Sequence, residues 1–84
     1  MASMRVRVRY FGPLKAQTGC EEEPLELPEG AAVSALLDAC GRLHPALAAS
    51  RPSLLVAVER EFAGPDTLLR PGQEIALMPP LSGG

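Results

Sequence analysis

The sequence has few of the residues that build metal centres, disulfide frameworks or large aromatic cores. Its 84 residues include two cysteines, one histidine, one tyrosine, two phenylalanines and no tryptophan. Cys20 and Cys40 do not form a Cys-x-x-Cys pair, and with His44 they offer too few ligands for a zinc site. We therefore expect no metal and two free thiols, one of them in a helix core, as in a protein of the reducing cytoplasm.

The sequence also lacks a basic stripe and a long apolar run. The net charge is −2, and the only basic run, Arg5, Arg7 and Arg9, has the spacing of one solvated face of a strand. This pattern argues against nucleic acid as a partner. The longest apolar stretch, Leu54 to Val58, is far too short to span a bilayer, and the N-terminus has no apolar run of the signal-peptide kind. We expect a cytoplasmic protein that has no contact with a membrane.

What the sequence does contain is enough aliphatic residues for one small domain, since 46% of its residues are hydrophobic. Strict alternation over Arg5–Tyr10 predicts a half-buried strand. Pro13 can open a short helix over Leu14–Thr18, which Gly19 closes. Glu22–Leu27 reads as a second strand, so the first two strands are expected to form an antiparallel hairpin with an elaborated connection.

The middle of the chain carries the pattern of one amphipathic helix. Val33, Leu36, Leu37, Cys40 and Leu43 recur at helical spacing, and His44-Pro45 ends the helix. We expect His44 to be a C-terminal helix residue with no catalytic role. An alanine-rich turn or short helix follows over Pro45–Ser50.

The last third predicts strands separated by strong turn signals. Leu54–Val58 suits a strand that is buried on both faces, and Glu61–Ala63 a brief strand. Pro71-Gly72 marks a turn before a final strand over Glu74–Met78. Pro79-Pro80 follows this strand and ends its pairing, because proline has no N–H to donate. This order predicts an α+β fold with one main helix packed on a mixed sheet, and a ubiquitin-like β-grasp is the commonest small fold that fits. We expect a domain over residues 1–78 and a flexible tail over residues 79–84.

The tail ends on Gly83-Gly84. Two residues without a Cβ can enter a channel that excludes any side chain, and the last of them would present an α-carboxylate. A frayed terminus is the alternative interpretation of the same residues.

Several motifs resemble one family. They are Arg9-Tyr10-Phe11-Gly12, Leu27-Pro28-Glu29-Gly30-Ala31, Leu55-Val56-Ala57-Val58, Leu69 to Leu77, and Pro79-Pro80-Leu81-Ser82-Gly83-Gly84. Together they resemble the sulfur-carrier branch of the ubiquitin-like superfamily, and most closely the small subunits of molybdopterin synthase. The sequence departs from that family at Glu59, where Asn is frequent, and at Pro71-Gly72-Gln73-Glu74, where Asp-Gly-Asp-Glu is usual.

The resemblance implies a carrier that binds no cofactor and holds no catalytic machinery of its own. An adenylyltransferase of the ubiquitin-activating type would use ATP and Mg²⁺ to adenylate the carboxylate of Gly84, and a sulfur donor protein would then convert it to a thiocarboxylate. The large subunit of the synthase, assembled with the carrier as a heterotetramer, would supply the catalytic residues. Sulfur would pass to a cyclic pyranopterin phosphate to form molybdopterin.

In this interpretation Pro79 and Pro80 stiffen the base of the tail, while Leu81, Ser82 and Gly83 carry Gly84 into the partner. Phe62, Leu77 and Met78 are candidates for an apolar contact patch, and a core position is the alternative interpretation for each. Three alternatives stay open: a sulfur carrier for thiamine, cysteine or transfer-RNA thiolation, a ubiquitin-like protein modifier, and a plain binding module.

Overall fold

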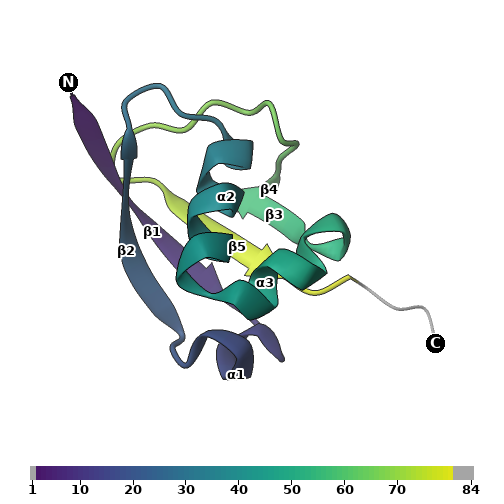
Figure 1. Ribbon diagram of the computed structural model, residues 1–84. Helices are drawn as coiled ribbons and strands as arrows, with labels where there is room; N and C mark the ends of the chain where they lie inside the picture. The colour runs from purple at the N-terminus through teal and green to yellow at the C-terminus, as the bar shows by residue number, and fades with distance from the viewer. Residues whose placement is uncertain (1, 81–84) are drawn as a thin grey trace.

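The fold is built on a mixed sheet of five strands with the helices packed against one face. The computed structural model describes residues 2–80, so the predictions for Leu81, Ser82, Gly83 and Gly84 lie outside the described residues. The elements in chain order are β1 (Ser3–Tyr10), α1 (Leu14–Thr18), β2 (Glu22–Pro28), α2 (Val33–Leu43), α3 (Pro45–Ser50), the 3₁₀ turn η1 (Arg51–Ser53), β3 (Leu55–Val58), β4 (Glu61–Phe62) and β5 (Glu74–Met78) (Figure 1).

The strand order across the sheet is β2-β1-β5-β3-β4. β1 and β2 form the expected antiparallel hairpin, and α1 lies in its connection. β5 runs parallel to β1 in the centre, and β3 pairs antiparallel with β5 and with β4. After β2, at one edge of the sheet, the chain passes through α2 and α3 to β3, which lies on the other side of the central β1–β5 pair. The predicted α+β class is therefore confirmed.

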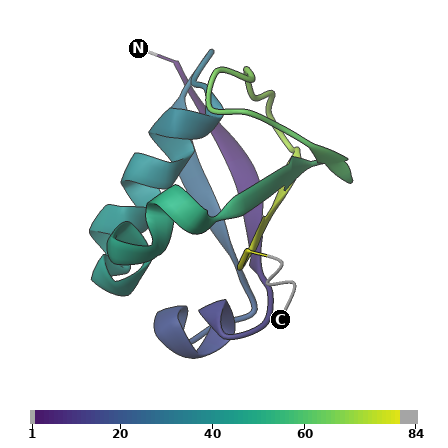
Figure 2. The same cartoon turned by 90° about the vertical axis from the view of Figure 1, so that its right-hand side faces the viewer.

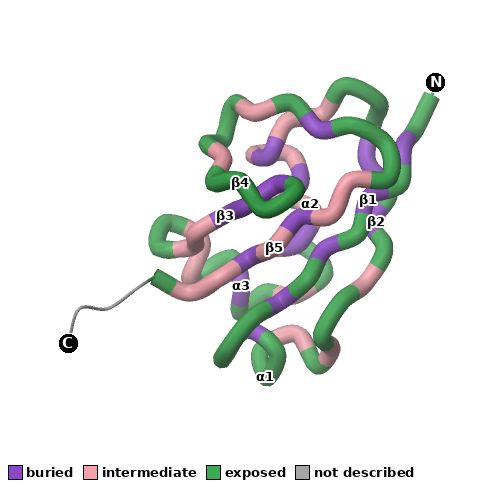
Figure 3. Tube along the Cα trace, turned by 180° about the vertical axis from the view of Figure 1, so that it is seen from behind, coloured by how far each residue is buried: buried purple, intermediate pink, exposed green. Residues whose placement is uncertain are grey.

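Alternation along the strands divides the sheet into an inner face and an outer face. On β1, Met4, Val6, Val8 and Tyr10 are buried, and Arg5, Arg7 and Arg9 are exposed. The inner face packs against α2 and α3, as the view in Figure 2 shows, and Val33, Leu36 and Cys40 are the buried stripe of α2. Figure 3 shows the strands from the opposite side, where buried and exposed residues follow one another along β1.

Most element boundaries agree to within two residues with those predicted from the sequence. β1 begins at Ser3, β3 begins at Leu55, and β4 ends at Phe62. The Pro45–Ser50 segment is a helix, begun by a proline at its first position, where a missing N–H costs nothing. None of the described helices has the length and apolar character needed to cross a membrane.

Candidate functional site

Part of the outer sheet face is apolar, on the strands that lead to the tail. Cross-strand partners share a face of a sheet, and the pairs Leu55–Met78, Ala57–Ala76 and Ala57–Phe62 all lie on the outer one. Phe11 joins them, since it lines a hollow together with Ala57 and Ala76. We call this group the outer patch; its members are Phe11, Leu55, Ala57, Phe62, Ala76 and Met78.

The outer patch is accessible through its two aromatic side chains. Phe62 is 74% exposed and Phe11 is 37% exposed, whereas Met78 and Leu55 are half-buried. The Arg9 guanidinium lies 5.2 Å from the centroid of the Phe11 ring, a cation–π distance. Large apolar side chains held at the surface by a rigid sheet are typical of a protein-contact site. Phe62 and Met78, both predicted as contact residues, thus lie where a partner can touch them.

Leu77 does not belong to this surface. β5 alternates, so Ile75 and Leu77 point to the inner face and are both completely buried. The prediction that Leu77 is part of an apolar contact patch is wrong. Its neighbour Met78 and the preceding Ala76 occupy the outer face instead, because successive residues of a strand point to opposite sides.

The rest of the outer face is covered by ion pairs. Arg7 contacts Glu22 at 2.7 Å, Arg9 contacts Glu74 at 3.0 Å, and Arg5 contacts Glu26 at 3.4 Å. All of these side chains keep more than two fifths of their surface exposed, so water screens each pair strongly. The arginine run is thus a solvated face paired with carboxylates, as the sequence predicted, and it borders the outer patch on one side.

The base of the tail is fixed at the end of the central strand pair. The Phe11 N–H donates to the Leu77 carbonyl oxygen at 3.1 Å, which extends the β1–β5 pairing by one residue. Gly12 then turns with φ 60°, and a Cβ at this position would lie 3.5 Å from Cγ of Pro79. The glycine therefore serves the backbone conformation, and Pro79 packs directly against it. The chain leaves the sheet at Pro79-Pro80, beside Met78 of the outer patch.

The β3–β4 hairpin carries three residues of the outer patch, and its turn contains Glu59, the position at which the sequence departs from the family. Its two turn residues, Glu59 and Arg60, have φ of 49° and 71°, values that asparagine and glycine adopt more readily. The Glu59 carboxylate accepts a hydrogen bond from the Glu74 N–H at 3.0 Å, and the Glu59 N–H donates to the Glu74 carbonyl at 3.0 Å. These bonds tie the turn to β5 and offset part of the cost of its left-handed backbone.

A polar cluster lies at the end of the inner face, where the sequence suggested no site. Glu23 points to the same face of β2 as the buried Leu25 and Leu27, and its Oε2 accepts a hydrogen bond from the Tyr10 hydroxyl at 2.5 Å. The same oxygen lies 2.6 Å from Nε2 of His44, the C-cap residue of α2. Cys20 completes a group in which the sulfur, carboxylate and imidazole donor atoms all lie within 4.8 Å of one another. No local motif joins these residues, because His44 is 21 positions from Glu23.

Burial controls the ionisation of the two side chains behind this cluster. Removal from water raises the pKa of Tyr10 far above its ordinary value of 10.0, and the hydrogen bond to Glu23 raises it further. Removal from water likewise raises the pKa of the Cys40 thiol from 9.0 to about 11, although the Tyr10 hydroxyl partly opposes this. Cys40 therefore stays a protonated, buried thiol at neutral pH. Both cysteines are free, as the sequence predicted.

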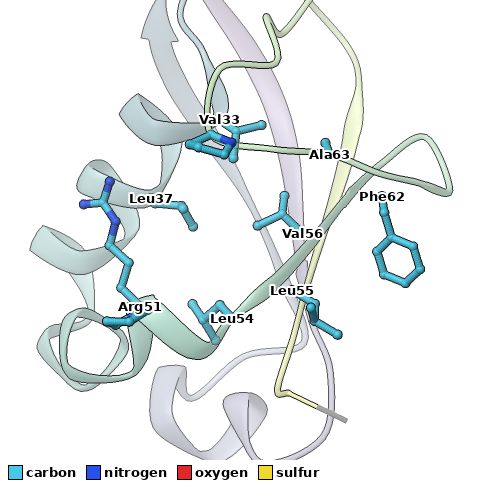
Figure 4. Close-up of a pocket in the computed structure, with 10 residues that line it drawn as sticks. Val33, Leu37, Arg51, Leu54, Leu55, Val56, Phe62 and Ala63 are labelled. Atoms are coloured by element: carbon cyan, nitrogen blue, oxygen red, sulfur yellow. The ribbon is translucent and has the colours of Figure 1, made fainter.

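A further hollow of about 520 Å³ opens at the edge of the sheet, between α2 and β3. Leu37 and Val56 face the space between these elements, whereas Phe62 lies on the far side of β3 from α2 (Figure 4). Its lining is apolar except for Arg51, whose guanidinium is engaged by the Asp38 carboxylate and the Ser34 carbonyl. Of the described residues, those of the outer patch and the tail base match the contact function that the sequence predicted more closely than this hollow does.

Comparison with known proteins identifies the family. The profile of the ThiS family matches residues 8–84, which is nearly the whole chain. The chain belongs to the ThiS family. Curated relatives from several organisms carry the name molybdopterin synthase sulfur carrier subunit. The one from Chlamydomonas reinhardtii is 35% identical over 96% of this chain and 100% of its own length, and the human one is 36% identical over 95% and 94%.

Solved structures show the same fold. A putative molybdopterin converting factor subunit 1 from Pyrococcus furiosus is 27% identical, with a TM-score of 0.86 over 93% of this chain and 99% of its own. A complex of subunits 1 and 2 of the molybdopterin-converting factor from Helicobacter pylori contains a chain that is 28% identical, with a TM-score of 0.64 over 96% and 100%. The ubiquitin-like β-grasp predicted from the order of elements is confirmed.

Proposed function

We propose that this chain is the sulfur-carrier subunit of a molybdopterin synthase. One observation carries the proposal: relatives of that name align with it at more than a third identity over nearly their whole length. The family match also runs through Gly84, the residue on which the chemistry depends. The outer patch and the fixed tail base support the proposal, because a carrier needs a docking surface next to its reactive arm.

The chemistry takes place at the carboxylate of Gly84. A carboxylate is a poor acyl donor, so an activating enzyme of the ubiquitin-activating type first attaches it to the α-phosphate of ATP, with Mg²⁺ and release of pyrophosphate. A sulfur donor protein then supplies sulfur at the oxidation level of sulfide, which attacks the acyl carbon, displaces AMP and leaves a thiocarboxylate on Gly84. ATP and Mg²⁺ are used by the activating enzyme and are not held by this chain.

The large subunit of the synthase is the proposed docking partner. Its surface would cover the outer patch, while the residues after Pro80 enter its active site and deliver sulfur to a cyclic pyranopterin phosphate. Two glycines at the end allow the backbone to approach closely, and two prolines at the base limit the entropy lost on insertion. Water then cleaves the bond between the acyl carbon of Gly84 and the transferred sulfur, so the carrier leaves with its carboxylate restored. Two carriers and two large subunits would form the complete synthase.

Intact-mass measurement tests this proposal. The full chain is incubated with the activating enzyme, ATP, Mg²⁺ and a sulfur donor, and we expect a gain of about 16 Da as oxygen is replaced by sulfur. A variant with one alanine added after Gly84 keeps the domain but moves the carboxylate, and we expect it to give no molybdopterin with the large subunit. An exposed-face variant, Glu26→Gln, serves as the matched control and should react normally.

Three results would count against the proposal. If the extended variant supports molybdopterin formation as well as the natural chain, the Gly84 carboxylate is not the reactive group. If the activated chain instead forms amide adducts with lysines of other proteins and passes no sulfur, the chain is a protein modifier. A charged carrier that serves only another thiolation partner would place it in a different pathway.

A further inference from the structure

The polar cluster at the end of the inner face has the composition of a metal site. Cys20 offers a sulfur, Glu23 a carboxylate oxygen and His44 an imidazole nitrogen, and these atoms lie within 4.8 Å of one another. Zn²⁺ accepts all three ligand types, at about 2.3 Å from sulfur and about 2.0–2.2 Å from nitrogen or oxygen. In a tetrahedral site these lengths place neighbouring ligand atoms about 3.3–3.7 Å apart. We propose that Cys20, Glu23 and His44 bind one Zn²⁺ ion, with a water molecule as the fourth ligand.

The local structure holds each ligand in place. Cys20 directly follows Gly19, which ends α1 in a left-handed conformation with φ 80°, and the Thr18 hydroxyl donates to the Cys20 carbonyl at 3.0 Å. Glu23 is fixed by its place on β2 and by the Tyr10 hydroxyl. His44 lies between α2 and α3, where its N–H donates to the Cys40 carbonyl at 2.8 Å. Rigid positions of this kind reduce the entropy that metal binding costs.

The Glu23–His44 contact marks the position for the ion. Their closest atoms are 2.6 Å apart, so a single proton lies between the carboxylate and the imidazole. A zinc ion would take the place of that proton, and the two atoms would separate by about 0.7 Å to reach tetrahedral spacing. Tyr10, which donates to the same carboxylate, would remain as the partner that orients this ligand.

The environment allows the ion to enter and favours its retention. The His44 and Glu23 side chains are 16% and 23% exposed, which leaves a path for metal and water. Tyr10 and Cys40 behind them are 1% exposed, so the cluster is closed to solvent on that side. Glu23 also points inward, on the same face of β2 as Leu25 and Leu27, where an unpaired carboxylate would be costly. A divalent ion would offset that cost more fully than a proton shared with His44.

The ion would join three segments of the chain. These are the loop after α1, the start of β2 and the junction of α2 with α3, and Figure 1 shows α1 beside that junction. A ligand that binds only the folded chain stabilises it, so zinc should raise the melting temperature. The site is independent of the outer patch, because it belongs to the inner face and not to the outer one. If the chain binds no zinc at this site, the proposed carrier function is unaffected.

Metal titration of the full chain tests the proposal. The protein is freed of metal with a chelator and kept reduced with a phosphine that does not bind metal. We expect calorimetry to give one Zn²⁺ per chain, and saturating Zn²⁺ to raise the melting temperature by about 5 °C or more. Cobalt(II) should give the charge-transfer absorption of a thiolate ligand and the strong visible bands of a tetrahedral ion.

Conservative variants separate the cluster from the rest of the surface. Cys20→Ser, Glu23→Gln and His44→Gln should each lower zinc affinity at least tenfold, and Cys20→Ser should abolish the thiolate absorption. Glu21→Gln, a neighbouring exposed carboxylate paired with Lys15, is the matched control and should bind like the natural chain. The natural chain decides the matter even if a variant fails to fold. Absence of a 1:1 complex, or a cobalt spectrum without a thiolate band, would overturn the proposal.

Discussion

The two faces of the same sheet use the same strands for different purposes. On β5, Ile75 and Leu77 are fully buried on the inner face, and Ala76 and Met78 lie on the outer face. On β1 the inner side chains are aliphatic or aromatic, and the outer ones are arginines paired with carboxylates. The inner face therefore sets stability, whereas the outer face can change without unfolding the domain. A carrier benefits from this separation, because its contact surface can be adapted to a partner while its core stays fixed.

The largest expected effect comes from truncating an inner residue. Leu77→Ala removes a completely buried side chain, and we expect it to lower the free energy of unfolding by about 2–5 kcal/mol. Its neighbour Met78→Ala, on the outer face, should cost about 1 kcal/mol or less. Urea unfolding of both variants measures the difference. Equal losses in the free energy of unfolding for the two substitutions would show that the two faces contribute equally to stability.

The second largest effect is a loss of stability at alkaline pH, caused by a buried thiol of the inner face. The Cys40 thiol has its pKa raised from 9.0 to about 11 by burial, so the folded state holds the proton that the unfolded chain releases above pH 9. Its contribution to stability is complete below pH 9 and is lost as the pH rises towards 11. Each pKa unit corresponds to about 1.4 kcal/mol, so we expect a loss of roughly 2–3 kcal/mol, with Tyr10 adding to it above pH 10.

Urea unfolding at pH 8 and pH 10.5 measures this loss. Cys40→Ala serves as the control, because it removes one of the two buried acids and should make stability less sensitive to alkali. If the natural chain unfolds at the same urea concentration at both pH values, burial does not hold the thiol in its protonated form.

A smaller effect, on binding alone, is expected at the outer patch. Phe62→Ala removes a side chain that is 74% exposed, so the free energy of unfolding should change by about 0.5 kcal/mol or less. Affinity for the large subunit should fall roughly tenfold or more, as for an aromatic anchor at a protein interface. Calorimetric titration against the purified large subunit measures it, with Glu26→Gln as the control. Unchanged affinity would exclude Phe62 from the docking surface.

The smallest effect should come from the ion-paired part of the outer face. Arg7→Gln breaks the 2.7 Å contact with Glu22, but the two side chains are 60% and 44% exposed, so water screens the pair. We expect a loss of about 1 kcal/mol or less, and a smaller one still in high salt. Melting temperatures at low and high ionic strength check this. A loss above 2 kcal/mol would show that the pair supports the fold.

The sequence predicted the elements well because their signals are local. The alternation in β1, the helical stripe of α2 and the turn at Pro71-Gly72 each depend on neighbouring residues. Leu77 was misplaced because a strand's face is set by its register with β1 and β3, and not by closeness to the tail. The Cys20–Glu23–His44 cluster was missed because it forms only when the end of α2 packs against the start of β2. The predicted roles of Leu81 to Gly84 remain predictions.

Single-turnover sulfur transfer tests the central claim most directly. The chain is charged as the thiocarboxylate, freed of ATP and the activating enzyme, and mixed with purified large subunit and cyclic pyranopterin phosphate. We predict that molybdopterin forms, that each product molecule consumes two charged chains because a dithiolene holds two sulfur atoms, and that the chain returns to its original mass. A thiocarboxylate that survives unchanged beside an active large subunit would contradict the account.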